Sequence, residues 1–313
     1  MKVIIQIPCL NEETTLPLVF KKMPKKIKGV DILEYMIVDD GSTDKTVAVA
    51  KKLGVHHIIS HPKNMGLARS FQDGVAYALS IGADIVVNTD GDNQYPQESI
   101  PELIQPILEG KADIVVGDRQ TSTIAHFSPL KKALQRFGSH IVNKAAGTNI
   151  PDAASGFRAY SRSSLMRLNI ITQFSYCMET IIQAGNKRIA ITSIPITTNA
   201  KTRESRLFTS MGQHVMKSGA AITRAYLMYK PHVIFTTLGL ILLAVGAIPF
   251  VRYVYLLING SDGSHLQSLI VGTTLLIGAF LSFVLGIVSD IIRTNRILTE
   301  ESLEHLKHIR FDK

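Results

Sequence analysis

The sequence has no tryptophan and only two cysteines among its 313 residues. Cys9 and Cys177 are far apart and lack the spacing of metal ligands, so they are predicted to be reduced thiols of a cytosolic compartment without a chemical role. No G-x-G-x-x-G follows the first apolar run, and no G-x-x-x-x-G-K-[ST] occurs anywhere. These absences argue against the glycine-rich dinucleotide site and the phosphate-binding loop. Residues 1–8 form an apolar run too short for a secretory signal and are expected to be a buried first strand.

The composition is that of a folded protein with a basic balance. Hydrophobic residues make up 46% of the chain, and the formal net charge is +9. The length allows one large α/β domain and a smaller part. The positive charge is compatible with nucleic acid, an anionic membrane surface or a phosphorylated substrate, and composition alone does not choose among them.

The first two hundred residues alternate short apolar runs with amphipathic segments. The runs predict strands at residues 2–8, 32–39, 57–60, 84–89 and 113–117, and helices at 12–23, 43–53, 66–80 and 98–109. This alternation favours a single α/β domain with a mostly parallel sheet covered on both faces. The stretch to about residue 200 is less regular, with a helix near 176–184 and a strand near 188–194.

The last third contains two long uncharged runs. Residues 233–251 are nineteen positions without a charge, the run continues past Arg252 to Ile258, and residues 266–288 are twenty-three more. About 20 apolar residues cross the hydrocarbon core of a bilayer, so both runs are predicted to be transmembrane helices that form a hairpin. Two buried helices of a soluble protein are the alternative that these lengths disfavour.

The distribution of Lys and Arg predicts the orientation of this hairpin. The linker 259–265 has none, whereas Lys217, Arg224 and Lys230 precede the hairpin and Arg293, Arg296, Lys307 and Arg310 follow it. Positive residues stay on the cytoplasmic side, so the chain is expected in the cell (plasma) membrane with its α/β domain and both termini in the cytoplasm. Arg252 lies near the outer end, where it could reach the headgroups.

A basic segment joins the two parts. Residues 201–230 contain six Lys or Arg and one acid, Glu204. Residues 210–229 have helical spacing of apolar side chains, which favours an interfacial helix on an anionic membrane. A solvated helix packed on the α/β domain is the alternative. The expected parts are therefore 1–205 (catalytic), 206–230 (interfacial), 231–292 (hairpin) and 293–313 (cytoplasmic tail).

Two polar motifs follow the first two predicted strands. Asn11 and Glu12 come directly after the first, where open α/β sheets bind ligands, although Asn11 could instead cap the next helix. Asp39 ends the second strand and suits a hydrogen bond to a base or a ribose. Ser42, Thr43 and Asp44 are interpreted as ordinary helix capping.

The strongest motif is Asn88-Thr89-Asp90-Gly91-Asp92-Asn93-Gln94, after the fourth strand. Two carboxylates separated by glycine, with an amide oxygen two residues on, form an oxygen set suited to Mg²⁺ or Mn²⁺, and substrate phosphates usually complete such sites. A calcium loop would need a terminal glutamate and flanking helices, and neither fits. A plain polar turn is the simpler alternative, which the position after a buried strand makes less favourable.

Together these motifs resemble glycosyltransferase family 2, and within it the polyprenyl-phosphate sugar synthases, such as dolichyl-phosphate mannose synthase and its bacterial undecaprenyl-phosphate relatives. The resemblance covers about residues 1–229 and rests on IPCLNEE, VDDGSTDKT, NMGLARSFQDG, NTDGDNQYPQE, VVGDRQ, DAASGFRAYSR and RESRLF, in this order. It implies a nucleotide-sugar-binding domain of the glycosyltransferase A type, which is Rossmann-like, and transfer of a hexose from a UDP- or GDP-sugar to a polyprenyl phosphate with inversion.

The resemblance also implies roles for individual residues. Asp90, Asp92 and Gln94 would hold the cation, and Asp90 and Asp92 would be catalytic together with Arg119 and Glu179. The nucleotide-sugar would be bound by Pro8, Leu10, Asn11, Glu12, Asp39, Asp90, Gly91 and Arg203, and the acceptor phosphate by Arg119, Lys132, Arg136 and Arg206. Arg203 and Arg206 replace the family's usual glycine and lysine, which leaves their individual roles open.

The general base that many members use is missing. They carry an aspartate after a glutamate, whereas this chain has Thr180 after Glu179. A sugar hydroxyl needs a base, but a lipid phosphate, with a second pKa of about 6, is already ionised at neutral pH. A phosphate acceptor and a cluster of cations are therefore expected. Glu179 would then orient a sugar hydroxyl or a basic side chain, or be a structural ion-pair partner.

Three other functions are alternatives to this one. A processive polysaccharide synthase carries Q-x-x-R-W, which a chain without tryptophan cannot contain. A transferase acting on diacylglycerol, a glycolipid or another lipid hydroxyl would need a base such as Glu179. A catalytically inactive membrane scaffold is disfavoured by the intact Asp90, Asp92 and Gln94. The expected partners are the nucleotide-sugar, the polyprenyl phosphate and the membrane, without nucleic acid, and a homo-oligomer is left open.

Overall fold

The computed structural model describes residues 1–121, 129–171, 176–200, 219–220, 229, 231–260 and 266–312. The chain divides into two compact units, Met1–Ala225 with Ser302–Lys313, and Tyr226–Glu301. Most of the basic segment 206–230, including the expected interfacial helix, lies outside the described residues.

The first unit is built on a seven-stranded sheet in the order β3-β2-β1-β4-β6-β5-β7. The strands are β1 (Lys2–Cys9), β2 (Ile32–Asp39), β3 (His57–Ser60), β4 (Ile85–Asn88), β5 (Ile114–Asp118), β6 (Arg158–Ser161) and β7 (Ile191–Pro195). All pairings are parallel except the two that β6 makes with β4 and β5. The predicted α/β class and mostly parallel sheet are confirmed. The four-residue β6 was not anticipated, because its sequence RAYS contains no apolar run.

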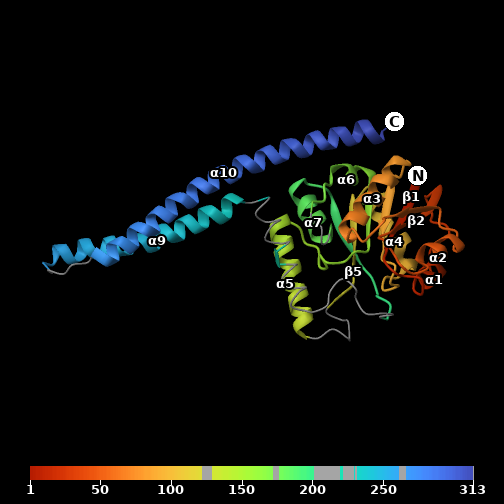
Figure 1. Cartoon of the computed structure of the whole chain (residues 1–313), viewed down its shortest axis with the longest axis horizontal. Coiled ribbons are helices and arrows are strands. Elements are labelled where there is room, and N and C mark those ends of the chain that lie inside the picture. Colours follow the sequence, from red (N-terminus) through yellow and green to blue (C-terminus); the bar gives the residue numbers. More distant parts are fainter. Residues whose placement is uncertain are drawn as a thin grey trace. The chain divides into compact units, whose positions relative to one another are not determined.

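Helices cover both faces of this sheet (Figure 1). They are α1 (Leu16–Lys21), α2 (Thr46–Lys52), α3 (Leu67–Ser80), α4 (Ile100–Leu108, after the 3-10 turn η1 at Gln97–Ser99), α5 (Pro129–Ala146), α6 (Arg162–Arg167) and α7 (Tyr176–Asn186). Because alternate residues of a strand face opposite sides, Ile5 of β1 packs into one core with α1 and α4, and Ile4 packs into the other with α3 and α7. This double burial explains why β1 is apolar almost throughout.

Two glycines allow close packing around the sheet. A Cβ at Gly74 of α3 would lie 2.6 Å from the Gln6 side chain. A Cβ at Gly185 of α7 would lie 2.0 Å from the carbonyl oxygen of Ala146, so any side chain there would push α7 away from α5.

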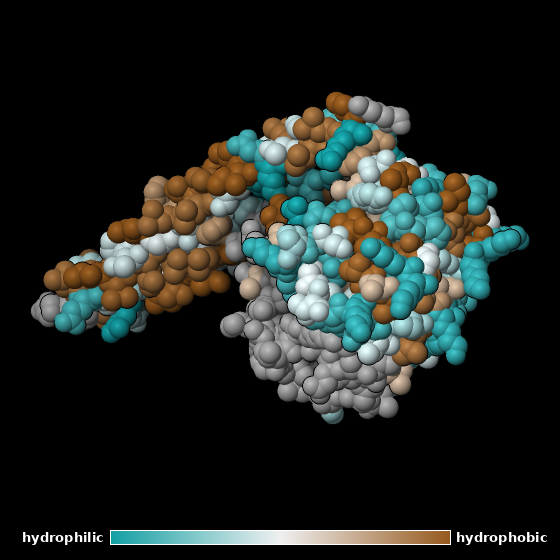
Figure 2. All heavy atoms as spheres, turned by 45° about the vertical axis from the view of Figure 1, so that its right-hand side comes forward, coloured by the Kyte–Doolittle hydropathy of each residue, from teal (hydrophilic) through white to brown (hydrophobic). Residues whose placement is uncertain are grey.

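The second unit contains two apolar helices. They are α9 (Pro231–Ile258) and the apolar part of α10 (Leu266–Phe311), each with a window of mean hydropathy 2.4 of which only 11% and 17% is buried. Figure 2 shows the apolar side chains on their surface. Both are long and apolar enough to cross a membrane, so the two predicted spans are present as helices. The stretch after residue 292, expected as a tail, continues α10 as far as Phe311.

Candidate active site

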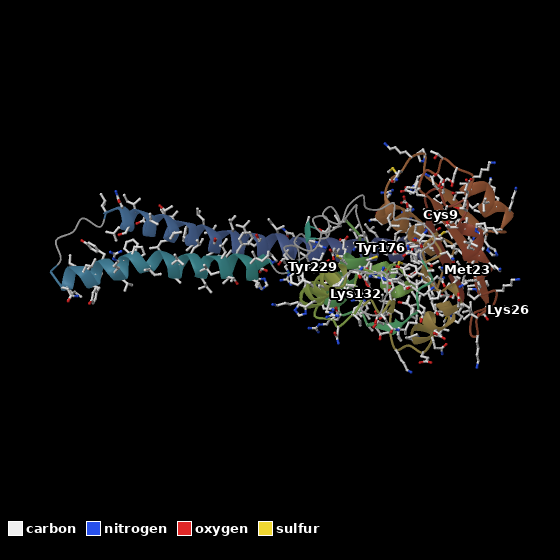
Figure 3. The ribbon with its side chains drawn as sticks, turned by 90° about the horizontal axis from the view of Figure 1, so that it is seen from below. Cys9, Met23, Lys26, Lys132, Tyr176 and Tyr229 are labelled. Carbon is white, nitrogen blue, oxygen red and sulfur yellow. The ribbon has the colours of Figure 1, made fainter. Side chains whose placement is uncertain are left out.

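Three parallel neighbouring strands end at one edge of the sheet. Cys9 of β1 pairs with Asp39 of β2, and Asn88 ends β4 beside β1. The motifs that follow these strands therefore meet. A Cβ at Gly91 would lie 3.1 Å from the sulfur of Cys9 and 3.2 Å from Cγ of Glu12. Burial raises the pKa of Cys9, which is labelled in Figure 3, well above its usual value, and this keeps the thiol protonated.

The loops after β1 and β2 are bonded to each other. Asn11 adopts the left-handed conformation (φ 56°), and its side-chain oxygen accepts a hydrogen bond from the Thr43 amide at 2.8 Å. The Asn11 amide donates to Ser42 Oγ at 2.8 Å, and the Glu12 amide donates to Thr46 Oγ1 at 2.7 Å. Asn11 thus joins two loops and does not cap α1, which begins after Thr15.

The adjacent carboxylates Asp39 and Asp40 have different surroundings. Asp40 accepts hydrogen bonds from the amides of Met65 and Gly66 and contacts His61 Nδ1 at 2.8 Å, so it fixes the loop that enters α3. Asp39 is 3% exposed and accepts from the Ser42 amide at 3.2 Å. Asp40 is therefore bonded to the loop that enters α3, whereas Asp39 is bonded to the loop that follows β2.

The loop carrying Asp90, Asp92 and Gln94 is held from several sides. Asp92 Oδ1 accepts from the Gln94 amide at 3.0 Å, and Asn93 is left-handed (φ 61°). Asn199, beyond β7, donates to the carbonyls of Asn93 at 3.0 Å and Tyr95 at 3.2 Å, and its amide donates to the Gln94 carbonyl at 2.9 Å. No motif indicated Asn199, because it lies in an ITTNA stretch more than a hundred positions from this loop.

Gly156 borders the Asp90 carboxylate. A Cβ there would lie 3.5 Å from both Asp90 oxygens. The Gly156 amide donates to the hydroxyl of Tyr95 at 2.9 Å, and Asn88 donates to the Gly156 carbonyl at 3.1 Å. Burial raises the pKa of Tyr95, so its hydroxyl stays neutral. The glycine of DAASGFR therefore leaves room beside the carboxylate.

The donor set fits a divalent cation that shares its shell with a diphosphate. Over the described stretches, no three His, Cys, Asp or Glu residues form a metal cluster. Asp90 and Asp92 supply two carboxylates on a backbone held in place, and Gln94 follows with an amide. Mg²⁺ and Mn²⁺ sites in phosphate-handling enzymes use few protein oxygens in this way.

Arg119, just after β5, forms a buried ion pair with Asp152. Its Nε and one Nη donate to the two carboxylate oxygens at 2.6 and 2.9 Å. Burial would raise the pKa of Asp152, but the Arg119 charge and hydrogen bonds hold it below its usual range. A phosphate could therefore reach only the remaining guanidinium donors.

Position 180 does not offer a base. Thr180 is fully buried, and its hydroxyl accepts a hydrogen bond at 2.7 Å from Arg158, which is itself fully buried. Glu179 is 4% exposed, and its carboxylate accepts from the Ile171 amide at 3.1 and 3.2 Å. In this structure Glu179 thus binds the backbone just before α7.

The other basic candidates are on α5 or outside the described residues. Lys132 is half-buried and Arg136 is exposed, both on α5 (Figure 3). Arg203 and Arg206 lie beyond the described part of the chain. Pro8 and Leu10 are half-buried at the end of β1.

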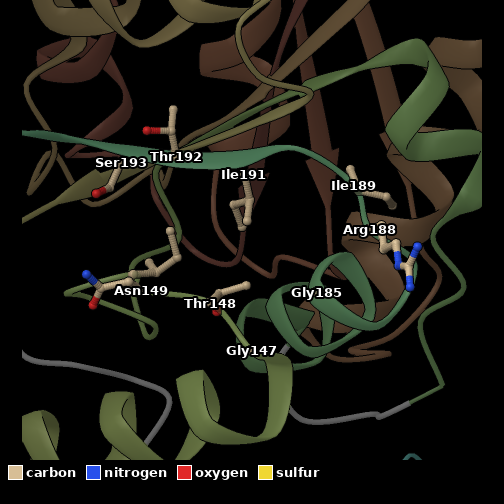
Figure 4. Close-up of a pocket in the computed structure, with 10 residues that line it drawn as sticks. Gly147, Thr148, Asn149, Gly185, Arg188, Ile189, Ile191, Thr192 and Ser193 are labelled. Carbon is tan, nitrogen blue, oxygen red and sulfur yellow. The ribbon is translucent and has the colours of Figure 1, made fainter.

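A separate cavity of about 420 Å³ lies between the ends of α5 and α7 and strand β7 (Figure 4). Its lining includes Thr148, Asn149, Arg188 and Thr192. It shares no residue with the site at the strand ends.

Comparisons with known proteins agree with this fold. The model of the family described as glycosyl transferase family 2 matches residues 4–168, more than half of the chain. A UDP-N-acetylglucosamine–dolichyl-phosphate N-acetylglucosaminyltransferase from Methanococcus voltae is 30% identical over 213 residues, covering 61% of this chain and 83% of that protein. A polyprenol monophosphomannose synthase from Mycolicibacterium smegmatis is 26% identical over 207 residues, covering 63% and 77%.

A solved structure adds to the evidence for the fold. Glucosyl-3-phosphoglycerate synthase from Mycobacterium tuberculosis, in complex with Mn²⁺, UDP and glucosyl-3-phosphoglycerate, matches with a TM-score of 0.53 at 23% identity, over 72% of this chain and 78% of that one. The chain belongs to glycosyl transferase family 2 and is a glycosyltransferase with a domain of the A type. The resemblance seen in the motifs is confirmed.

Proposed function

We propose that this enzyme transfers a hexose from a UDP- or GDP-sugar to a polyprenyl phosphate at the cytoplasmic face of the cell membrane, with inversion. The observation that carries the acceptor assignment is position 180, where a buried threonine bonded to Arg158 replaces the expected base. An acceptor that is already ionised needs no base there. The names of the two relatives and the apolar helices α9 and α10 support the same acceptor.

The donor would bind at the edge formed by β1, β2 and β4. Asp39 would bond the base or ribose, with Pro8, Leu10, Asn11 and Glu12 beside it. Asp90, Asp92 and Gln94 would hold Mg²⁺ or Mn²⁺, which stabilises the charge that develops on the leaving diphosphate. Gly156 lies next to the Asp90 carboxylate, and Gly91 allows the loop to approach Cys9 and Glu12 closely.

The acceptor phosphate would be bound by cations. Arg119 follows β5 and Lys132 and Arg136 are on α5, while Arg203 and Arg206 are proposed from the sequence. Their role is to bring together two anions that repel each other, because charge-assisted hydrogen bonds to phosphate are strong. The phosphate oxygen would then attack the anomeric carbon from the face opposite the diphosphate.

The test is a comparison of acceptors. Purified enzyme in detergent is incubated with a panel of UDP- and GDP-sugars and with either undecaprenyl phosphate or free undecaprenol, and products are identified by mass spectrometry. We expect an acid-labile phosphodiester product, inverted at the anomeric carbon, with the phosphate only. Transfer to the alcohol or to diacylglycerol, without product on the phosphate, would overturn the proposal.

A Glu179→Gln variant separates the two roles of that residue. Gln keeps an oxygen for the Ile171 amide but cannot accept a proton. If Glu179 only positions the backbone, the variant should retain most activity, with an unchanged pH–rate profile. Loss of the acidic limb of that profile, where a carboxylate base becomes protonated, would identify Glu179 as a base and favour a hydroxyl acceptor.

A further inference from the structure

The end of α10 groups with the catalytic unit and contacts it closely. We call residues 302–312 the C-terminal strap. Lys307 of this strap donates to three oxygens: the carbonyls of Met166 at 3.1 Å and Leu168 at 2.6 Å, and Asn169 Oδ1 at 2.8 Å. The last carbonyls of a helix have no partner inside it, and α6 ends at Arg167. Lys307 thus satisfies the end of α6 from a segment about 140 residues away.

Further contacts fix the strap on the same surface. Arg162 donates to the carbonyl of Phe311 and to Asp312 Oδ1 at 3.0 Å, and also to the carbonyls of Leu79 and Ala83. Phe311 packs against the core beneath α3 and α7. The strap therefore contacts α6, the segment that follows α6 and the core that includes α3 and α7, which is more than one surface ion pair would provide.

The segment that Lys307 holds is also held by α7. The Asn169 amide donates to Gln183 Oε1 at 2.9 Å, and the Ile171 amide donates to the Glu179 carboxylate. Gln183 in turn donates to Glu179 Oε1 at 3.3 Å. A continuous chain of hydrogen bonds therefore runs from Lys307 through Asn169 and Gln183 to Glu179.

We propose that Lys307 is a positioning residue, through which the C-terminal strap fixes residues 168–171 and the Glu179 carboxylate bonded to them. Its ammonium offers three donors to three oxygens of one short segment, so an apolar side chain would leave two backbone carbonyls and one amide oxygen without this donor. The link from Glu179 to the acceptor, as the residue beside the position of the usual base, rests on the proposed function. The positioning itself rests on the contacts alone.

The experiment compares Lys307→Met, Lys307→Arg and Glu304→Gln in the full chain, reconstituted in nanodiscs. Glu304 is the matched control, since it lies on the same strap and, within the described part of the chain, pairs with the side chain of Arg167 at 3.8 Å. In Lys307→Met, amide hydrogen exchange at Asn169 and Ile171 should be roughly ten-fold faster, and KM for undecaprenyl phosphate should rise roughly ten-fold with KM for the nucleotide-sugar unchanged. Lys307→Arg should restore part of both effects, and Glu304→Gln should resemble the wild type.

Several results would overturn the inference. One is unchanged exchange at residues 168–171 in Lys307→Met, and another is an equal rise of both KM values together with faster exchange throughout the domain. If Lys307→Met does not fold, the same measurements are made on Asn169→Ala, which removes one of the three oxygens that accept from Lys307. If the wild type does not glycosylate polyprenyl phosphate, the proposed function fails, while the exchange measurement still decides the role of Lys307.

Discussion

Arg119 and Asp152 form a two-point ion pair that joins the end of β5 to the loop before β6. Nε–Oδ2 is 2.6 Å, Nη2–Oδ1 is 2.9 Å, and the Asp152 side chain is only 2% exposed. The same loop is held by Arg158, which donates to the carbonyls of Ala153 and Ser155. Since this loop carries Gly156 to the Asp90 carboxylate, the half-buried Arg119 and the fully buried Arg158 shape one wall of the candidate site.

Asp152→Asn should destabilise the protein by about 3 kcal/mol at pH 7, roughly 5–10 °C in Tm, because it leaves Arg119 without its counter-charge. The folded-state pKa of Asp152 lies below its unfolded value. The stability that the charged Asp152 contributes is therefore fully present above the ordinary pKa of a carboxylate. It is lost as the pH falls through the lower pKa of the folded state. Between pH 7 and pH 3, the Tm of Asp152→Asn should fall by less than the Tm of the wild type. Asp118→Asn, at the end of β5, is the control, and parallel curves for Asp152→Asn and wild type would contradict the prediction.

Asp92→Ala should abolish sugar transfer while the protein stays folded and in the membrane. EDTA should do the same to the wild type, and Mg²⁺ or Mn²⁺ should restore it, since the site offers only oxygen ligands. Activity and thermal unfolding are measured together, with the exposed Glu102→Ala as control. Full turnover of Asp92→Ala in chelator would refute the metal site.

Asn199→Ala should weaken the apparent metal affinity roughly 10- to 100-fold, because Asn199 holds the backbone of residues 93–95 without being a ligand. The measurement is activity as a function of Mn²⁺ concentration, with saturating metal expected to recover most of the rate. The exposed Asn149→Ala, beside the separate cavity, should leave the titration unchanged. A loss that no metal concentration repairs would instead mean that Asn199 acts directly in catalysis.

A cysteine at Asn259 should react with an impermeant thiol reagent added to intact cells. Asn259 is exposed at the end of α9, in the linker without Lys or Arg, which is expected outside. The two native cysteines are buried, so the background should be low. Labelling of a cysteine at Asp312 in intact cells, with none at Asn259, would reverse the orientation.

Much of the fold follows from local pattern. The predicted strands at 32–39 and 57–60 match β2 and β3 at both ends, and the apolar runs predicted α9 and the apolar part of α10. These runs are long or continuously buried, and such patterns carry their own structural signal. The short β6 was missed because its neighbours β4 and β5, not its own composition, make it a strand.

Only the residues whose motif indicates a chemical role could be predicted as members of the candidate site. Strand-end position indicated Asp39, Asp90 and Asp92, and parallel pairing brings their loops together. The structure alone showed that Asp40 is engaged by the loop entering α3 and that Asn11 joins two loops. Such partners are set by contacts between distant segments, which no local pattern records.

The family, the α/β class, the oxygen-rich DGDNQ loop and the two apolar helices could all be predicted from the sequence alone. This was possible because periodicity, charge spacing and motif order are properties of the chain. Tertiary structure decided which polar groups meet: Arg119 with Asp152, Thr180 with Arg158, Asn199 with the loop after Asp92, and Lys307 with the end of α6. The physical reason is that buried polar groups need partners, and the packed fold alone determines which residues lie within reach.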